Sequence, residues 1–185
     1  YPSDELEGHT AGTFLYERLG QPRLVLFSGD ADYARGIEPE FLKQFEEALG
    51  GEVAADIDLS SAGWQQRADA ALAGGGLGAA YVIGYAPEIL EVVRYLRERA
   101  FTGRIVTTST FYSGDAIREA GAAAEGVMFP LPPFDRTSEK EPVLSFVNRY
   151  METYQRAPDV FAAHGYDAMG FTLQVFTIAR PPETL

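Results

Sequence analysis

Short apolar segments alternate with helical segments up to about residue 129, and this alternation constrains the fold more than any other feature. Runs typical of buried strands span residues 23–27, 52–59, 79–83, 104–108 and 126–129. Between them, apolar residues recur at helical spacing, and glycines such as Gly50 and Gly51 close the helices. Strand–helix alternation with short loops favours a parallel sheet with helices on both faces. We therefore predict an α/β fold.

The amino-terminal helices have recognisable boundaries. The first is predicted to run from Asp4 to Leu19, with Asp4 and Glu7 in a capping arrangement and Gly20 ending it. We expect its buried face to carry Leu6, Thr10, Phe14 and Leu15. The second helix is expected to begin near Ile37, with Pro39 in its first turn.

The pattern changes after residue 129. Pro130, Pro132 and Pro133 indicate an extended crossing, and two helices follow at about 142–154 and 160–178 with no strand between them. The last helix is apolar on most sides, so it is expected to be buried. The preceding sheet is already covered on both faces, so these two helices need another partner.

Aromatic and hydroxyl side chains follow three of the strands. Tyr33 follows the first strand, Tyr85 the third, and Ser109, Thr110 and Phe111 the fourth. In a parallel sheet these positions share one edge, where ligands collect. A tyrosine there can offer a ligand a flat wall and one hydrogen bond, or can cap the edge of the core. For residues 109–111, ligand binding and ordinary turn formation explain the sequence equally well.

Patterns associated with catalysis and metals are weak. Asp30 and Asp32 have the D-x-D spacing of some magnesium sites, but turn formation and helix capping explain them better. The glycines of residues 74–78 end a helix and lead into a strand, which is the wrong context for a phosphate loop. The chain has no cysteine, no G-x-S-x-G and no H-E-x-x-H. We predict no metal, no cofactor and no enzymatic activity; an enzyme on a flavodoxin-like sheet is the weakest alternative.

Charge excludes one class of partner. The formal net charge is −12, whereas binding to a phosphate backbone requires Lys and Arg. We therefore predict no nucleic-acid partner.

Four stretches in order, GDADYARG, GYAPEILEVVRYLRE, AGAAAEGVMF and FAAHGYDAMGF, resemble the branched-chain amino acid receptor family of the type I periplasmic binding proteins. The resemblance implies a two-lobed, Rossmann-like receptor that captures a small ligand and delivers it to the permease of an ABC transporter. It also implies that residues 1–130 are the second lobe and 131–138 a Pro-rich crossover. Residues 139–185 would be two helices that pack on a first lobe outside this chain. The resemblance also implies that this chain is part of a longer protein, which is expected to be periplasmic or otherwise extracytoplasmic. A membrane-anchored lipoprotein is one form that this longer protein would take.

The resemblance also implies binding residues. Tyr33 and Tyr85 correspond to two tyrosines that bind the ligand, while the carboxylate expected to pair with the ligand's ammonium group falls on Ser109. Serine carries no charge, so either the ammonium finds another acceptor or the ligand is not an α-amino acid. We favour the second reading, with amides, aliphatic acids or aromatic acids as ligands. The candidate ligand-binding residues are Tyr33, Tyr85, Ser109, Thr110, Phe111 and Asp32.

A second class of function shares this fold. An interaction or sensor domain, such as an activator of cell-wall enzymes or a receptor ectodomain, would tolerate Ser109 in place of the carboxylate. In either case the unpartnered final helices lead us to expect a dimer, a swapped oligomer, or docking back onto the chain's own sheet.

Overall fold

The computed structural model describes residues 3–178. They divide into two compact units, and the boundary along the chain falls between Leu131 and Pro132. The first unit contains one five-stranded sheet of order β2-β1-β3-β4-β5, in which every neighbouring pair is parallel. This confirms the predicted α/β fold. The strands are β1 (Arg23–Ser28), β2 (Glu52–Asp58), β3 (Ala79–Ile83), β4 (Arg104–Thr107) and β5 (Val127–Met128).

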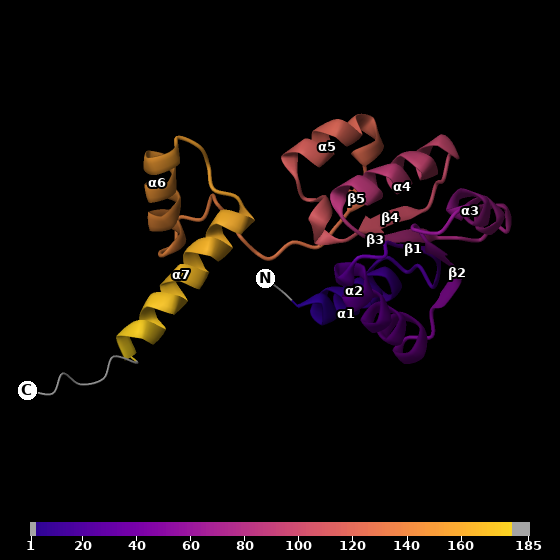
Figure 1. Ribbon diagram of the computed structural model, residues 1–185, viewed down its shortest axis with the longest axis horizontal. Helices are drawn as coiled ribbons and strands as arrows, with labels where there is room; N and C mark the ends of the chain where they lie inside the picture. The colour runs from indigo at the N-terminus through magenta and orange to yellow at the C-terminus, as the bar shows by residue number, and fades with distance from the viewer. Residues whose placement is uncertain (1–2, 179–185) are drawn as a thin grey trace, which may run out of the picture. The chain divides into compact units, whose positions relative to one another are not determined.

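Helices cover both faces of this sheet (Figure 1). Helix α1 and helix α2 lie on one face, and α3, α4 and α5 lie on the other (Figure 1). The α-helices of this unit are α1 (Asp4–Thr13), α2 (Asp32–Leu42), α3 (Trp64–Ala73), α4 (Ala86–Glu98) and α5 (Gly114–Ala120). Two π-helical segments, η1 (Phe14–Arg18) and η2 (Lys43–Ala48), extend α1 and α2, and two 3₁₀ segments are η3 (Ser109–Phe111) and η4 (Gly121–Ala124).

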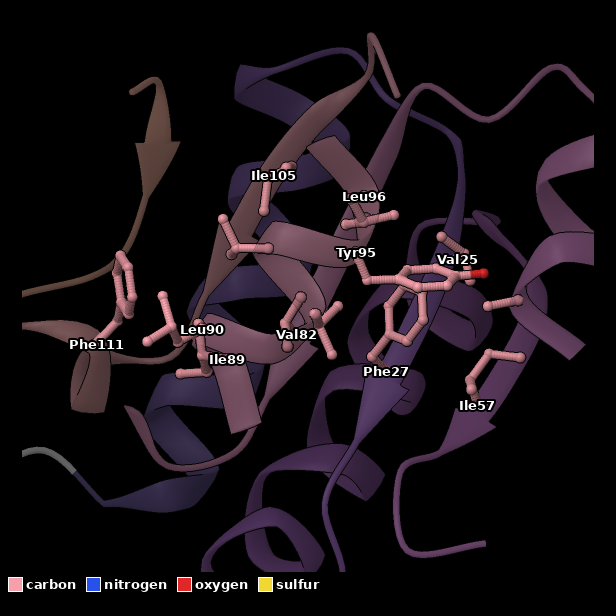
Figure 2. Close-up of a cluster of buried hydrophobic side chains, with 14 of the residues drawn as sticks. Val25, Phe27, Ile57, Val82, Ile89, Leu90, Tyr95, Leu96, Ile105 and Phe111 are labelled. Atoms are coloured by element: carbon pink, nitrogen blue, oxygen red, sulfur yellow. The ribbon is translucent and has the colours of Figure 1, made fainter. Parts of the chain in front are cut away.

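Side chains of the central strands alternate between two hydrophobic cores, because successive residues of a strand point to opposite faces. Leu24 and Leu26 of β1 join Phe41 in the core beneath α1 and α2. Val25 and Phe27 join the core beneath α3 and α4, which Figure 2 shows. Full burial of one such side chain contributes about 1.5–3 kcal/mol, so both layers are firmly attached to the sheet.

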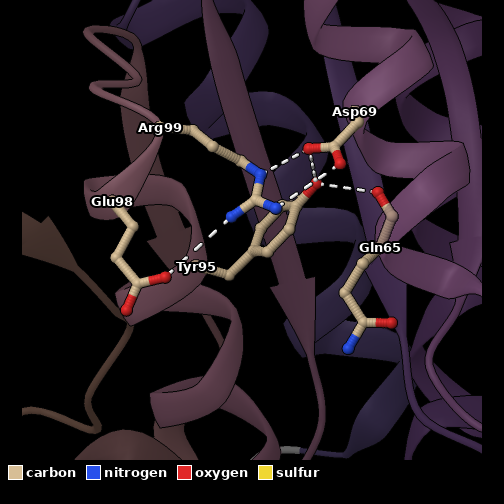
Figure 3. Close-up of polar contacts among 5 residues, drawn as sticks. All are labelled: Gln65, Asp69, Tyr95, Glu98 and Arg99. Atoms are coloured by element: carbon tan, nitrogen blue, oxygen red, sulfur yellow. Dashed lines mark hydrogen bonds and ion pairs between the residues drawn. The ribbon is translucent and has the colours of Figure 1, made fainter.

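A polar network joins α3 to α4 at the surface (Figure 3). The Tyr95 hydroxyl lies 2.7 Å from Asp69 Oδ1 and 2.9 Å from the Gln65 carbonyl oxygen. Arg99 forms an ion pair with Asp69, and its guanidinium carbon lies 3.6 Å from the centre of the Tyr95 ring. The hydrogen bond from Arg99 lowers the pKa of Asp69, which keeps this carboxylate charged.

Two helix predictions were wrong in detail. Helix α2 begins at Asp32, so Pro39 lies inside it and cannot donate the usual hydrogen bond to the preceding turn. Ser3 is the N-cap of α1, and its Oγ accepts a hydrogen bond from the Leu6 N–H at 3.3 Å.

The predicted buried face of the first helix was right for Leu15 but wrong for Leu6 and Thr10, which are exposed. Leu6 is 54% exposed, and the buried residues are Glu7, Gly8, Ala11, Gly12 and Leu15. The glycines explain the difference. A Cβ placed on Gly8 would lie 2.4 Å from the carbonyl oxygen of Ile37 in α2, so α1 can approach α2 closely only on its glycine side.

The second unit contains α6 (Val143–Tyr154) and α7 (Val160–Ile178). Its buried side chains include Phe146, Val147 and Val160. Most of the large apolar side chains of α7 are exposed: Phe161, Tyr166, Met169, Phe171, Leu173, Val175, Phe176 and Ile178. Within residues 3–178, no helix combines the length and the hydropathy needed to cross a bilayer.

Candidate functional site

The candidate site lies where β1 and β3 end, side by side in the centre of the sheet. The chain leaves β1 into α2 on one face and leaves β3 into α4 on the other face (Figure 1). At such a point the two connections diverge, and the crevice between them is the usual ligand position in an open α/β sheet. Tyr33 stands in the first turn of α2, and Tyr85 is the N-cap residue of α4.

The two tyrosines stack on each other at this point. Their ring centroids are 5.4 Å apart and their planes are 25° from parallel, a stacked arrangement. Tyr33 is partly buried, whereas Tyr85 is 48% exposed. The backbone N–H of Tyr85 donates to Glu88 Oε2 at 2.8 Å, which fixes the start of α4. The pair therefore presents an aromatic surface with one accessible ring.

A buried carboxylate lies beside the tyrosines. Glu7 of α1 is only 4% exposed. Its Oε1 accepts a hydrogen bond from the Ser109 backbone N–H at 2.7 Å. Its Oε2 accepts from the Tyr33 hydroxyl at 3.0 Å and from the Ser109 hydroxyl at 3.2 Å. We call Glu7, Tyr33 and Ser109 the Glu7 cluster.

The electrostatics of the Glu7 cluster keep its phenol protonated. Burial raises the pKa of Tyr33, and the negative charge of Glu7 raises it further, while the hydrogen bond with Ser109 acts in the opposite direction. Tyr81 of β3 is completely buried, and burial followed by the charge of Glu7 raises its pKa well above the ordinary value. Within residues 3–178, no Lys, Arg or His forms an ion pair with Glu7.

Thr110 is held next to the residue that precedes Tyr85. Its Oγ1 donates to the Gly84 carbonyl oxygen at 2.6 Å, and Thr108 Oγ1 donates to the same oxygen at 2.9 Å. Gly84 directly precedes Tyr85. The exits of β3 and β4 are therefore tied together, which places the partly buried Thr110 beside the tyrosine pair.

Phe111 and Asp32 have other environments. Phe111 is 1% exposed and packs edge-to-face on Phe129, with ring centroids 5.9 Å apart, in the core of Figure 2. Its ring is therefore enclosed by the core. The Asp32 carboxylate is fully exposed and pairs with Arg35 at 3.0 Å, one helical turn further along α2.

Glu7 was missed as a site residue, because its spacing from Asp4 suggested a helix cap. A signal for it exists in the sequence. Glu7, Ala11 and Leu15 recur every four residues and are all buried, so an acidic residue occupies the apolar stripe of α1. Such a residue needs hydrogen-bond partners inside the fold.

A separate acidic hollow lies at the ends of β1 and β2. It has a volume of about 430 Å³ and is lined by Ser28, Gly29, Asp30, Arg35, Glu38, Asp56 and Asp58. Partial desolvation, together with the charge of Glu38, raises the pKa of Asp56 to about 6. Across the described part of the chain, no three His, Cys, Asp or Glu side chains are grouped to hold a metal ion.

Comparisons with known proteins give a consistent result. Residues 1–184 match the family model described as periplasmic binding protein. A leucine-, isoleucine-, valine-, threonine- and alanine-binding protein of Pseudomonas aeruginosa is 25% identical over 168 residues, which are 90% of this chain and 44% of that protein.

Solved structures agree. A leucine-binding protein, LivK, of Thermotoga maritima aligns with a TM-score of 0.82 and 29% identity over 95% of this chain and 50% of its own. The branched-chain amino acid transporter substrate-binding protein LivJ of Streptococcus pneumoniae, in complex with isoleucine, aligns with a TM-score of 0.71 and 29% identity over 89% of this chain and 47% of its own. The chain thus spans about half the length of these relatives.

Proposed function

We propose that this chain, which belongs to the periplasmic binding protein family, supplies the ligand-binding lobe of an extracytoplasmic receptor that captures a small amino-acid-like, amide or carboxylate ligand for an ABC transporter. The ligand lies on the crevice at the ends of β1 and β3. Residues up to 130 form the ligand-binding lobe, and residues 131–138 are a crossover. The helices of 139–185 belong with a complementary lobe.

The stacked pair of Tyr33 and Tyr85 carries this proposal. The exposed Tyr85 ring stands at the centre of a sheet edge and stacks on Tyr33, and the partly buried Thr110 is bonded to the residue before Tyr85, so a flat apolar wall lies beside polar groups that can fix orientation. These are the ingredients of a small-molecule site. The proposed role is binding without chemical conversion of the ligand.

The apolar residues of α7 support the two-lobed part of the proposal. Phe171, Phe176 and Ile178 are among the most exposed of the large side chains, and exposed apolar area on this scale is typical of an interaction site. Relatives about twice as long as this chain supply the length needed for a second lobe to cover it.

Thermal unfolding of the full-length encoded protein, in the presence of single amino acids, amides and carboxylates, tests the proposal. A ligand that binds only the folded state at about 100 times its Kd stabilises by about 2.7 kcal/mol. We expect at least one compound to raise the Tm. Tyr85→Ala should weaken binding of that compound about tenfold because the aromatic wall is lost, whereas Tyr85→Phe should keep most of the affinity.

Tyr154→Ala is the matched control, since Tyr154 is an exposed tyrosine (60%, compared with 48% for Tyr85) of α6 in the other unit. It should bind like the unmodified protein. If no compound stabilises the protein, or if Tyr85→Ala binds as well as Tyr154→Ala, the receptor proposal fails, and the interaction or sensor class becomes the better explanation.

A further inference from the structure

We infer that Glu88 is a positioning residue of the ligand site, because its carboxylate sets how the rings of Tyr33 and Tyr85 face each other. Glu88 lies in the first turn of α4 and is partly buried. The inference rests on the proposed function and adds to it the residue that shapes the aromatic wall. Glu88 acts through the tyrosines and is assigned no contact with the ligand.

The peptide group between Gly84 and Tyr85 is held at both of its polar ends. Its N–H donates to Glu88 Oε2 at 2.8 Å. Its carbonyl oxygen accepts from the hydroxyls of Thr108 and Thr110, at 2.9 and 2.6 Å. Because a peptide group is planar, bonds at both ends fix the direction in which the Tyr85 side chain leaves the backbone. Glu88 supplies the bond on the N–H side.

The carboxylate of Glu88 also lies against both strand exits. A Cβ added to Gly84 would lie 2.7 Å from Glu88 Oε2, and a Cβ added to Gly29 would lie 3.0 Å from each carboxylate oxygen. Gly29 follows β1 and begins the loop that leads to Tyr33, whereas Gly84 follows β3 and precedes Tyr85. One carboxylate therefore fills the space that two glycines leave open beside the segments carrying the two rings.

The stacked arrangement of the rings depends on how these two segments are held. The ring centroids are 5.4 Å apart, and the planes are 25° from parallel. Aromatic stacking is compatible with a range of offsets and tilts, so a single arrangement requires that the backbone on each side be fixed. Removal of the Glu88 carboxylate takes away the partner of the Tyr85 N–H and opens the space beside Gly29.

A role in helix capping must be separated from this positioning role, because an acidic side chain in the first turn also stabilises a helix. Loss of a cap lowers the stability of the fold, whereas loss of positioning changes the rings and the affinity of protein that stays folded. Two quantities are therefore measured in the full-length encoded protein.

The first quantity is the nuclear Overhauser effect between the rings of Tyr33 and Tyr85, with labelled tyrosine and signals assigned through Tyr33→Phe and Tyr85→Phe. It is recorded without ligand. The second is the affinity at pH 7, by isothermal titration, for three probes: leucine, leucinamide and 4-methylpentanoate.

Glu88→Ala should weaken the ring–ring effect and should lower the affinity for any probe that binds by about fivefold, the size expected for one lost hydrogen bond. Glu88→Gln should restore both quantities, because its amide oxygen can accept the same Tyr85 N–H. Glu46→Ala is the matched control, since Glu46 Oε1 accepts the Val53 backbone N–H at 2.9 Å near the start of β2. It should lower stability and leave both quantities unchanged.

Gly84→Ala displaces the same carboxylate by a second route. The added Cβ would meet the flexible end of the Glu88 side chain, so it should push the carboxylate off the Tyr85 N–H and act like Glu88→Ala. In the Glu88→Ala background there is no carboxylate to displace, and Gly84→Ala should have little further effect. Such non-additivity identifies two residues that act through one contact.

An unchanged ring–ring effect in folded Glu88→Ala overturns the inference, and so does an unchanged affinity for a probe that binds. Additive effects of Gly84→Ala and Glu88→Ala also overturn it. If circular dichroism shows that Glu88→Ala does not fold, an unchanged ring–ring effect in Gly84→Ala overturns it. Because that effect is measured without ligand, it decides the role of Glu88 even when none of the three probes binds. The proposed function fails separately, when no compound of the wider panel raises the Tm, so the two failures are distinguishable.

Discussion

Two aspartates near the end of β2 have opposite electrostatic environments although only Ile57 separates them. Partial desolvation and the charge of Glu38 raise the pKa of Asp56 to about 6. Hydrogen bonds from the Ser60 hydroxyl and backbone N–H, at 2.7 and 2.8 Å, lower the pKa of Asp58. The first carboxylate therefore opposes folding when it is charged, and the second favours it.

We expect Asp56→Asn to stabilise the protein at neutral pH. A carboxyl group with a raised pKa in the folded state contributes stability below about pH 4, and this contribution is lost as the pH rises to about 6. Asparagine removes the penalty above that range. The gain should stay below about 1 kcal/mol because Asp56 is solvent-exposed. Urea unfolding at pH 4, 6 and 8 measures it.

Asp58→Asn is the control, because it should change the stability in the opposite direction. Its lowered pKa means that the charged form stabilises the fold above about pH 4 and that this contribution is lost as the pH falls below it. We therefore expect Asp58→Asn to lower stability at pH 8. Equal changes in the free energy of unfolding of both variants would contradict the assignment of these two environments.

At the scale of elements, the contact between α1 and α2 depends on Gly8. A Cβ at this position would lie 2.4 Å from Ile37 O and 3.0 Å from Phe41 N, both backbone atoms that cannot rotate away. The same contact holds the neighbouring Glu7 against Ser109. The spacing of two helices thus fixes the position of a carboxylate beside Tyr33 and Ser109.

We expect Gly8→Ala to destabilise the protein, because overpacking costs about 1–3 kcal/mol and exceeds the gain of about 1 kcal/mol in helix propensity. Gly170→Ala in α7 is the control, since no atom lies within 4 Å of its added Cβ. It should stabilise by about 0.5–1 kcal/mol. Denaturant unfolding compares the two; a neutral Gly8→Ala would show that α1 can move away from α2.

Most elements were predictable because their signals are local. The run Ala79–Ile83 and the helix Val160–Ile178 have the bounds expected from hydrophobicity alone. The buried face of α1 was not predictable in that way, because the fit of Gly8 against α2 decided it. The site was predictable only in part. Tyr33 and Tyr85 stand at strand exits, which sequence identifies, whereas the bond from Ser109 to Glu7 joins distant segments.

At the scale of the whole molecule, the main feature is that α7 exposes large apolar side chains that burial would stabilise. Its exposed side chains include Phe171 and Phe176, and each would gain about 1.5–3 kcal/mol from full burial. We expect the 185-residue chain expressed alone to self-associate and to bind a hydrophobic dye. Phe171→Gln with Phe176→Gln should shift it toward monomer, as sedimentation velocity would show. A monomeric, dye-silent chain would mean that α7 needs no partner.

The tyrosine pair draws its two members from different layers of the protein. Tyr33 packs with the core under α1 and α2, while Tyr85 begins the helix that anchors the opposite core. A substitution that repacks either layer therefore also shifts one ring relative to the other. If the pair binds a ligand as proposed, substitutions in either core change what the site accepts without altering either tyrosine.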